Sequence, residues 1–391
     1  MSSGFEAYKL RTRFVLIPYL GLLMIAVAET LMGPAFPFIL KEFTIPFGLL
    51  GLLASVWSLG YMLSSVGGIL SDHYGELLLV NVSLVITGSA VALTSIASTY
   101  QVLMGLFMLG GIGAGFADAS MNPLISRLYP SRSGFALNLL HLFYSLGAFI
   151  GPVLAGLLIA RYGSWRLPYQ VTSIIFFPLI VVATITVFRF KRNGRELSID
   201  SRRASVGETL RFGRALVLAG FFYFSAEYGT IAWLPAFLMF TRGFPTDLAG
   251  FTLGLFWAGQ VGGRLLLGSV TDQLGFKKVV IICSIAGAFL ILAGTLVESQ
   301  YGIMVLWWLA GFVSGPILPT IFALTNRLFQ SGKGFATGVI NSAGYLGGVF
   351  SPWFIGTVAQ LYSLNLSLFF LAFSTLAIGL SVLNMKGDYT R

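Results

Sequence analysis

Three acidic residues lie deep inside long apolar stretches of the sequence, where charged side chains are rare. Glu29, Asp118 and Glu227 each stand about ten to fifteen residues from one end of such a stretch, which at about 1.5 Å per helical residue is near the middle of a bilayer. A charged side chain at that depth costs several kcal/mol, so such residues usually face the interior of a helix bundle and mark a transport pathway. We therefore expect these three carboxyls to bind protons.

Basic groups at the same depth are scarce. Arg264 lies about six residues from one end of its stretch, and His141 is the other candidate. Three carboxyls and one fixed cation cannot all stay ionised in a low dielectric, so at least one carboxyl should load and release a proton. Two other interpretations stay open. A protonated carboxyl can simply hydrogen-bond a neighbouring helix, and the site can bind sodium instead of protons.

Arg264 and His141 also have two interpretations. They could form part of a cytoplasmic gate or bind an oxygen atom of a solute. Alternatively, Arg264 extends to the lipid headgroups or pairs with Asp272, and His141 only packs between helices.

Amide and aromatic side chains in the same stretches supply the chemistry that recognises a sugar. Amides can hydrogen-bond hydroxyl groups, and a tryptophan ring can stack on a sugar ring. Buried amides in lipid also hold helices together, so that interpretation stays open. The candidates for solute binding are Glu227, Asn122, Asn138, Gln260, Asn341, Trp233 and Trp257.

The motifs of enzymes and of metal or cofactor sites are absent. The glycine-rich run 110–115 lies inside an apolar stretch with no preceding strand, so it does not fit a dinucleotide-binding loop. The sequence has no Gly-Lys-Ser/Thr phosphate loop, two histidines far apart and one cysteine, Cys283. We expect no enzymatic activity, no cofactor and no metal.

Composition places these residues in a membrane protein. The chain has 391 residues, of which 56% are hydrophobic and 10% charged, whereas soluble domains carry about 25% charged residues. The apolar stretches predict twelve transmembrane helices, so we expect an all-α membrane protein. Their approximate ranges are 14–40, 47–70, 77–98, 101–128, 134–160, 167–188, 215–240, 247–270, 279–297, 301–328, 335–361 and 364–385.

The distribution of basic residues predicts the orientation. If both termini are cytoplasmic, 19 of the 24 Lys and Arg lie on the cytoplasmic side, and four lie in the outer loops. This bias indicates a multi-pass protein of the cell membrane with cytoplasmic termini. The net charge of +10 comes partly from the basic segment 189–214, which we expect to contact lipid headgroups and not nucleic acid.

An internal repeat divides the chain. The octapeptide GILSDHYG at 68–75 matches GSVTDQLG at 268–275, an offset of 200 residues. The same offset aligns Gly111 with Gly311, Gly115 with Gly315, Arg127 with Arg327, and Pro152 with Pro352. We expect two pseudo-symmetric six-helix bundles, 1–188 and 215–391, joined by a cytoplasmic linker at 189–214. Parallel repeats of this kind indicate a transporter whose halves rock about a central site.

The repeated Gly-x-x-x-Asp-x-x-Gly pattern resembles the cytoplasmic loop motif of the major facilitator superfamily. The resemblance covers essentially the whole chain and implies that family's twelve-helix fold. It also implies a gating role for Asp72 and Asp272, and it places Arg264 and His141 on helices that face each other across the two halves. The first copy departs from the motif, because Glu76 stands near the position where the second copy has Lys277 and Lys278.

Shorter stretches resemble the fucose permease group of sugar:proton symporters. Asp118 and the Asn122-Pro123 pair match its acidic-x-x-x-Asn-Pro stretch, in which the carboxylate binds protons. The segment 138–148 is similar to fifth-helix stretches of the same and neighbouring sugar-carrier groups. His141 and Tyr144, which are also candidates for solute binding, stand in that segment where fucose permeases tend to carry amides, so the resemblance does not specify the sugar.

These observations predict a secondary active transporter that couples import of a sugar or similar polar solute to protons. The alternative is a proton-driven exporter of amphipathic or drug-like compounds. A transporter-like receptor or structural membrane protein would leave the deep acids without a use. The expected partners are a small-molecule solute, protons or sodium, and membrane lipids, with the protein acting as a monomer.

Overall fold

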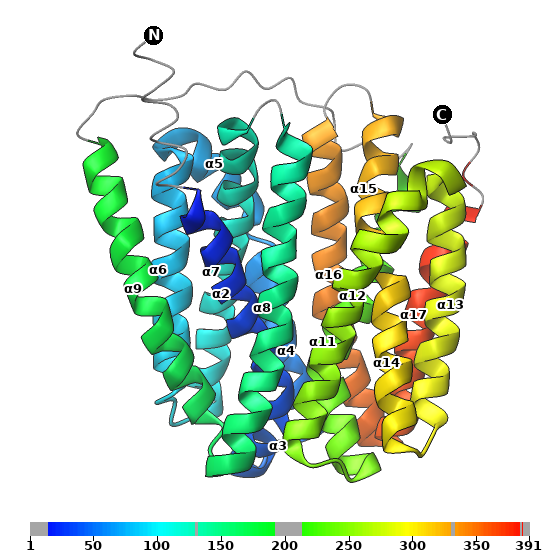
Figure 1. Ribbon diagram of the computed structural model, residues 1–391. Helices are drawn as coiled ribbons and strands as arrows, with labels where there is room; N and C mark the ends of the chain where they lie inside the picture. Colours follow the sequence, from blue (N-terminus) through cyan, green and yellow to red (C-terminus); the bar gives the residue numbers. More distant parts are fainter. Residues whose placement is uncertain (1–14, 130–131, 192–212, 330–332, 384, 386–391) are drawn as a thin grey trace.

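The structure, a computed structural model, describes residues 15–129, 132–191, 213–329, 333–383 and 385. Within these ranges every regular element is a helix, and the helices stand side by side as twelve segments, three of them in two pieces (Figure 1). The first six segments are α2 (Leu16–Thr30) with α3 (Met32–Phe43), α4 (Phe47–Tyr61) with α5 (Ser64–Tyr74), α6 (Glu76–Thr94), α7 (Tyr100–Leu128), α8 (Ser133–Tyr162) and α9 (Arg166–Lys191). The second six are α11 (Arg214–Arg242), α12 (Thr246–Leu274), α13 (Phe276–Leu296), α14 (Gln300–Ser314) with α15 (Ile317–Leu328), α16 (Lys333–Leu361) and α17 (Leu364–Leu383).

The predicted all-α fold of twelve segments is confirmed, with ends that differ by a few residues from the sequence ranges. Ten of the segments are long and apolar enough to cross a membrane. The other two, α12 and α16, carry polar side chains such as Gln260, Arg264 and Asn341. Both lie along the boundary between the two halves, α12 against α8 and α16 against α4, so their polar residues face protein more than lipid.

Proline sets two of the breaks within segments. Because proline lacks an N–H and its ring clashes with the carbonyl four residues earlier, it disrupts the helix there. Helix α2 ends at Thr30, four residues before Pro34, and α14 ends at Ser314, just before Gly315 and Pro316. These breaks leave backbone carbonyls without helical partners inside the bundle.

The last glycine of each repeated motif has the same backbone conformation. Gly75 and Gly275 both have φ of +91° and join α5 to α6 and α12 to α13. Glycine adopts such a positive φ without a steric penalty. The motif therefore keeps glycine at this position for the sharp connection between two helices.

The other repeated glycines hold helices together within each half. A Cβ atom on Gly111 would lie 2.0 Å from the carbonyl oxygen of Trp57, where α7 crosses α4. In the second half, a Cβ on Gly311 would lie 1.9 Å from the carbonyl oxygen of Phe256, where α14 crosses α12. The equivalent contacts show that the sequence repeat is also a repeat of helix packing, in which small residues allow backbones to approach closely.

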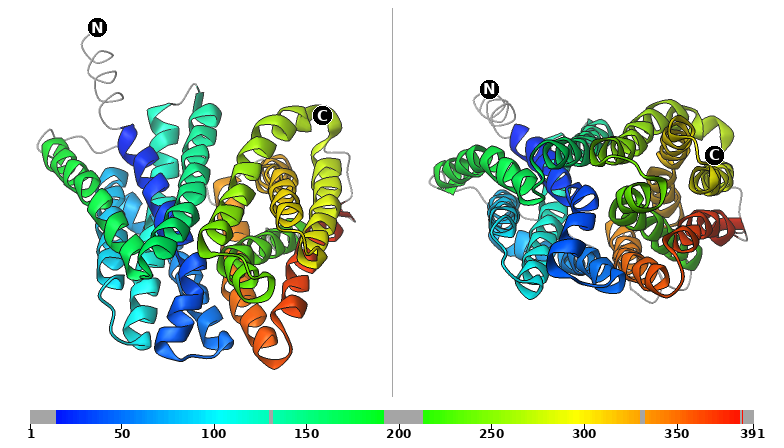
Figure 2. Two further views of the ribbon diagram at one scale, coloured as in Figure 1. Left: turned by 60° about the horizontal axis from the view of Figure 1, so that its bottom comes forward. Right: turned by 90° about the horizontal axis from the view of Figure 1, so that it is seen from below.

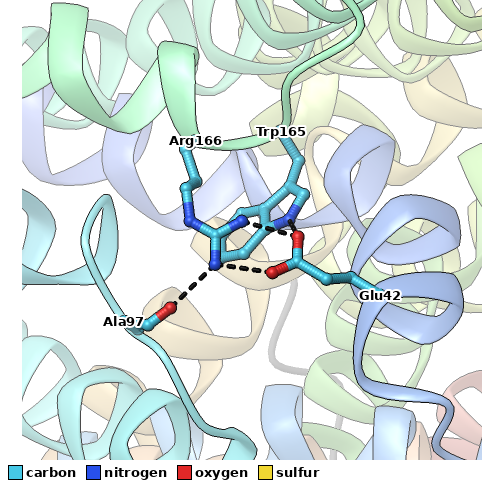
Figure 3. Close-up of polar contacts among 4 residues, drawn as sticks. All are labelled: Glu42, Ala97, Trp165 and Arg166. Carbon is cyan, nitrogen blue, oxygen red and sulfur yellow. Dashed lines mark hydrogen bonds and ion pairs between the residues drawn. The ribbon is translucent and has the colours of Figure 1, made fainter.

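Each half has its own polar brace on the side of the bundle opposite the start of α2, which we call the far side. In the first half, Arg166 binds both carboxylate oxygens of Glu42 and donates to the carbonyl oxygen of Ala97 at 2.8 Å (Figure 3). Trp165 Nε1 also donates to Glu42, at 2.7 Å. In the second half, Arg242 donates to the carbonyl oxygen of Thr295. These contacts tie the far-side ends of three segments in the first half and two in the second.

The two halves contact each other closely on the far side. A Cβ on Gly51 of α4 would lie 2.1 Å from the carbonyl oxygen of Pro352, and one on Gly250 of α12 would lie 2.2 Å from that of Pro152. Gly48 also donates its N–H to Gln360 Oε1 at 3.3 Å. Here the backbones of opposite halves touch, and the view along the bundle shows the halves side by side (Figure 2).

On the side where α2 begins and α17 ends, which we call the terminal side, the same helix faces are open. Eighteen residues make five helical turns and return to the same face. On α5, Ile69 is 67% exposed, and a Cβ on Gly268, five turns from Gly250 along α12, would have no atom within 4 Å. The same holds for Gly338, five turns from Gly356. The structure is therefore a conformation closed on the far side and open on the terminal side.

This asymmetry predicts opposite effects for two matched substitutions on α12. Gly250→Ala places a methyl group against the backbone of Pro152, whereas Gly268→Ala adds the same atom in open space. We expect Gly250→Ala to shift the population toward a conformation open on the far side, and Gly268→Ala to leave it unchanged. Distances between spin labels at positions 69 and 338 would measure the shift as a shortening, and equal distances in the two variants would contradict the prediction.

Candidate solute and proton site

Glu29 lies where the two halves meet. It is fully buried near the end of α2, and Tyr144 of α8 donates its hydroxyl to Oε2 at 2.9 Å. The other carboxyl oxygen, Oε1, has no hydrogen-bond partner among the described residues. Trp57 of the same half and Tyr228 of the opposite half lie close to the carboxyl. A change in the charge of Glu29 would therefore act on both halves.

Asp118 occupies a more open position on α7. Its side chain is half-buried, and Asn122 Nδ2 donates to Oδ1 at 2.8 Å. Pro123, one residue later, leaves the carbonyl of Ala119 without its usual helical donor. The Asp-x-x-x-Asn-Pro stretch thus forms a polar surface on this helix. The amide and the carboxyl can bond because residues four positions apart lie on the same helix face.

Tyrosines from opposite halves stack beside these acids. The rings of Tyr61 on α4 and Tyr345 on α16 have centroids 4.7 Å apart and lie within 23° of parallel. Phe224 contacts Tyr345 and stacks on Tyr228, with centroids 5.1 and 6.1 Å apart. The sequence analysis missed Tyr61, Tyr228 and Tyr345. Their depth was the available signal, because tyrosine in membrane helices is enriched at the interfaces and not at the middle.

Arg264 connects the second half to the first. NH1 donates to Ser145 Oγ of α8 at 2.6 Å, NH2 donates to Gln260 Oε1 at 2.9 Å, and Nε donates to the carbonyl oxygen of Gly315 at 3.3 Å. All three acceptors are neutral, and no carboxylate among the described residues lies within ion-pair distance. Glu227 of α11 is near enough to interact with Arg264 through space, and Tyr223 and Gln260 lie beside its carboxyl.

One of the remaining solute-binding candidates packs in the central cluster, and three others are partly or fully exposed. Trp257 contacts Tyr144 edge to face at 5.7 Å, so it belongs to the central cluster. His141 is exposed one turn from Ser145, Asn138 is exposed at the opening on the terminal side, and Asn341 is half-buried one turn from Tyr345.

Trp233 lies apart from this cluster. It is fully buried, and its Nε1 donates to the carbonyl oxygen of Pro352 at 2.9 Å. The rings of Phe36 and Phe47 from the first half pack against it, with centroids 6.1 and 5.8 Å away. The structure therefore places Trp233 in the far-side closure between the halves.

The loops that carry the predicted gate differ between the two halves. Asp72 is exposed on α5, and the side chain of Asp272 lies outside the described residues. Glu76, which departs from the motif, forms an ion pair with Arg127 of α7. At the equivalent place in the second half, the guanidinium of Arg327 lies 4.1 Å from the ring centroid of Phe276. An ion pair in one half thus corresponds to a cation–π contact in the other.

Two six-helix halves that meet around buried acids, with one side closed and the other open, have the architecture of a membrane transporter. The sequence profile of the Major Facilitator Superfamily matches residues 19–273 and 216–387. The chain belongs to this family, as the repeated loop motif predicted. It is a transporter and not an enzyme.

Named relatives and solved structures agree with this assignment. The chain is 30% identical over 329 residues to the 3-(3-hydroxy-phenyl)propionate transporter of Escherichia coli (strain K12), covering 80% of this chain and 76% of the relative. It is 23% identical over 346 residues to the hexuronate transporter of Bacillus subtilis (strain 168), covering 80% of each. The crystal structure of a D-xylose-proton symporter superposes with a TM-score of 0.75 at 16% identity, covering 97% of this chain and 99% of that structure. This last similarity establishes the fold.

The two equivalent loop contacts predict which substitution the first half tolerates. Glu76→Phe reproduces the pair found in the second half, whereas Glu76→Ala leaves Arg127 without this partner. Because Glu76 is 6% and Arg127 28% exposed, the pair is largely shielded from water, and we expect the loss in Glu76→Ala to exceed the roughly 1 kcal/mol of an exposed pair. The melting temperature should fall for Glu76→Ala and stay near that of the unchanged protein for Glu76→Phe. A lower value for Glu76→Phe than for Glu76→Ala would argue against the equivalence.

Proposed function

We propose that this protein is a proton-coupled symporter that imports a sugar or a similar polar solute by alternating access. It resides in the cell membrane with the terminal side facing the cytoplasm, as the bias of basic residues predicts. The conformation described above is then the inward-open state. Asp118 and Glu29 serve as the proton-coupling groups, and the central tyrosines, Trp257 and Gln260 surround the solute.

The buried position of Glu29 is the observation that carries this proposal. An ionised carboxylate without a basic partner is very costly in a low dielectric, and the described residues provide Glu29 with uncharged neighbours such as Tyr144 but with no ion pair. The Glu29 carboxyl is therefore stable between the packed halves if it holds a proton. It can release the proton when the halves separate and water enters. This is the cycle that couples solute movement to a proton gradient.

Arg264 extends the proposal to the charge of the solute. Its guanidinium binds only neutral oxygens among the described residues, so it can still take an anion as a two-pronged partner. Two of the relatives above are named for carboxylic acids, a hydroxyphenylpropionate and a hexuronate. We therefore favour a hydroxylated carboxylate, such as a sugar acid, within the broader class of polar solutes.

One feature favours export of an amphipathic cation as a second candidate. The stacked rings of Tyr61 and Tyr345, together with Phe224 and Tyr228, lie beside two acids, and aromatic faces near carboxylates suit cationic ligands. An exporter would release protons inward as it moves such a compound outward.

A melting-temperature screen distinguishes these candidates, because a ligand that binds only the folded state raises the melting temperature. We expect glucuronate to raise it more than glucose, which has the same ring but no carboxylate. Arg264→Gln should remove this difference, since the amide cannot balance the anion. Stabilisation by hydrophobic cations alone would favour the exporter and contradict the symporter.

The coupling role of Asp118 predicts a separation between accumulation and exchange. Asp118→Asn mimics the protonated carboxyl and keeps a polar partner for Asn122. In proteoliposomes with an imposed pH gradient, we expect this variant to lose uphill solute accumulation and to keep counterflow exchange. Glu29→Gln is the matched comparison. If Asp118→Asn still concentrates solute with unchanged pH dependence and Glu29→Gln does not, the coupling proton resides on Glu29.

A further inference from the structure

A groove on the outer surface of the bundle follows the boundary between the two halves. It has a volume of about 430 Å³ and lies along α16, between α4 of the first half and α11 of the second. Three of the α16 residues in it are substantially exposed, so the groove opens toward the surroundings of the bundle. The six lining side chains are all apolar or aromatic: Leu52 from α4, Phe221 from α11, and Leu346, Val349, Phe350 and Trp353 from α16.

The groove lies at the depth of the acyl chains in the far-side half of a bilayer. Leu52 stands five residues from the far-side end of α4 at Phe47, and Trp353 and Leu346 stand 8 and 15 residues from the far-side end of α16 at Leu361. At about 1.5 Å per residue these positions are roughly 8 to 22 Å from the helix ends, and half of the hydrocarbon core is about 15 Å thick. None of the six lining side chains is charged, so the groove suits a hydrocarbon chain and not a headgroup.

The other boundary between the halves, where α12 meets α8, fills the equivalent space with a ring. The matching glycine–proline contacts align α4 with α12 at an offset of 199 residues, and the sequence repeat aligns α16 with α8 at an offset of 200. Val349 therefore corresponds to Phe149, and Leu52 corresponds to Phe251. The ring of Phe149 lies across its boundary, because a Cβ on Gly254 of α12 would be 3.3 Å from Phe149 Cδ2. Beside Leu52, the smaller valine leaves this space to an occupant from outside the protein.

We propose that the groove holds one acyl chain of a phospholipid from the far-side leaflet, and that this chain stabilises the conformation closed on the far side. Both walls exist only while α4 lies against α16, because Leu52 belongs to the first half and the other five lining residues belong to the second. A groove without an occupant would forfeit dispersion contacts on both walls, and a chain between them restores these contacts. A ligand that binds one conformation better shifts the equilibrium toward it.

A lipid chain fits this groove better than a second protein does. A stable protein interface buries about 800 Å² on each partner, which is far more than six partly covered side chains along one helix present. A single chain needs only a narrow apolar channel. Because lipid surrounds the transmembrane helices, it is also the partner that is always available at this depth. The proposed role concerns the conformational equilibrium of the protein and does not depend on the identity of the solute.

The first test measures lipid bound to the whole protein. The double variant Leu52→Phe/Val349→Phe copies the residues of the other boundary and fills the groove. After purification in a steroid-based detergent, which has no alkyl chain, we expect mass spectrometry to find one phospholipid retained by the unchanged protein and lost from the double variant. Ile150→Phe is the matched control, because it adds a ring at a position of α8 that is 41% exposed. This control should retain the lipid.

The second test leaves the groove residues unchanged, so it remains decisive if the double variant fails to fold. Spin labels at positions 69 and 338 are introduced after Cys283→Ser, and their distance is measured in the delipidated protein in the same detergent, without solute. We expect lysophosphatidylcholine, which has one acyl chain, to raise the long-distance, terminal-side-open population severalfold. Glycerophosphocholine, which has the same headgroup and no chain, should leave the population unchanged. The double variant should show the long distance without added lipid.

Three results would overturn the proposal. They are retention of the phospholipid by the double variant, the absence of a response to lysophosphatidylcholine, and an equal response to glycerophosphocholine. A dimer of the unchanged protein that dissociates in the double variant would also overturn it, since a second copy would then cover the groove. Because neither test uses solute or a proton gradient, failure of the symporter proposal would leave these expected results as they are.

Discussion

The close approach of glycine backbones between the halves is the constraint on which the rest of the structure depends. Lipid gives no hydrophobic drive for one helix to join another, so association relies on close packing and on polar contacts. At Gly51 and Gly250 the opposite backbone occupies the space of a side chain. This contact brings α4 against α16 and α8 against α12, and so it places their polar residues where the halves meet.

The central site follows from this packing. With the far side closed, Tyr61 meets Tyr345 and Arg264 reaches Ser145 across the boundary. Glu29 is buried at the same level. The Arg264 contact, the tyrosine stacking and the closure of the far side therefore depend on the same arrangement of the two halves. A change in one of them alters the other two. That dependence is what allows a proton or a solute to bias the equilibrium between two packed arrangements.

The sequence predicts the fold well and the site only in part. Hydrophobic stretches and the repeat at an offset of 200 predict the twelve segments, because burial in lipid is a local requirement of each helix. Depth alone also selects Glu29, Asp118, Glu227 and Arg264. Contacts across the boundary are different, since the stacking of Tyr61 on Tyr345 depends on how two distant helices are turned. For the same reason, the sequence did not predict that Trp233 packs in the far-side closure. The repeat did mark the glycine at 275, and its φ of +91° explains why the motif keeps glycine there.

The two braces on the far side give the halves different sensitivity to their surroundings. Glu42 and Arg166 are 41% and 26% exposed, so dissolved salt can screen the attraction between them. Arg242 binds a backbone carbonyl, which carries no net charge to be screened. High ionic strength outside the membrane should therefore loosen the end of the first bundle more than that of the second. The two halves of a duplicated fold therefore differ at their far-side ends. The end of the first half responds to the salt concentration of the medium, and the end of the second half does not.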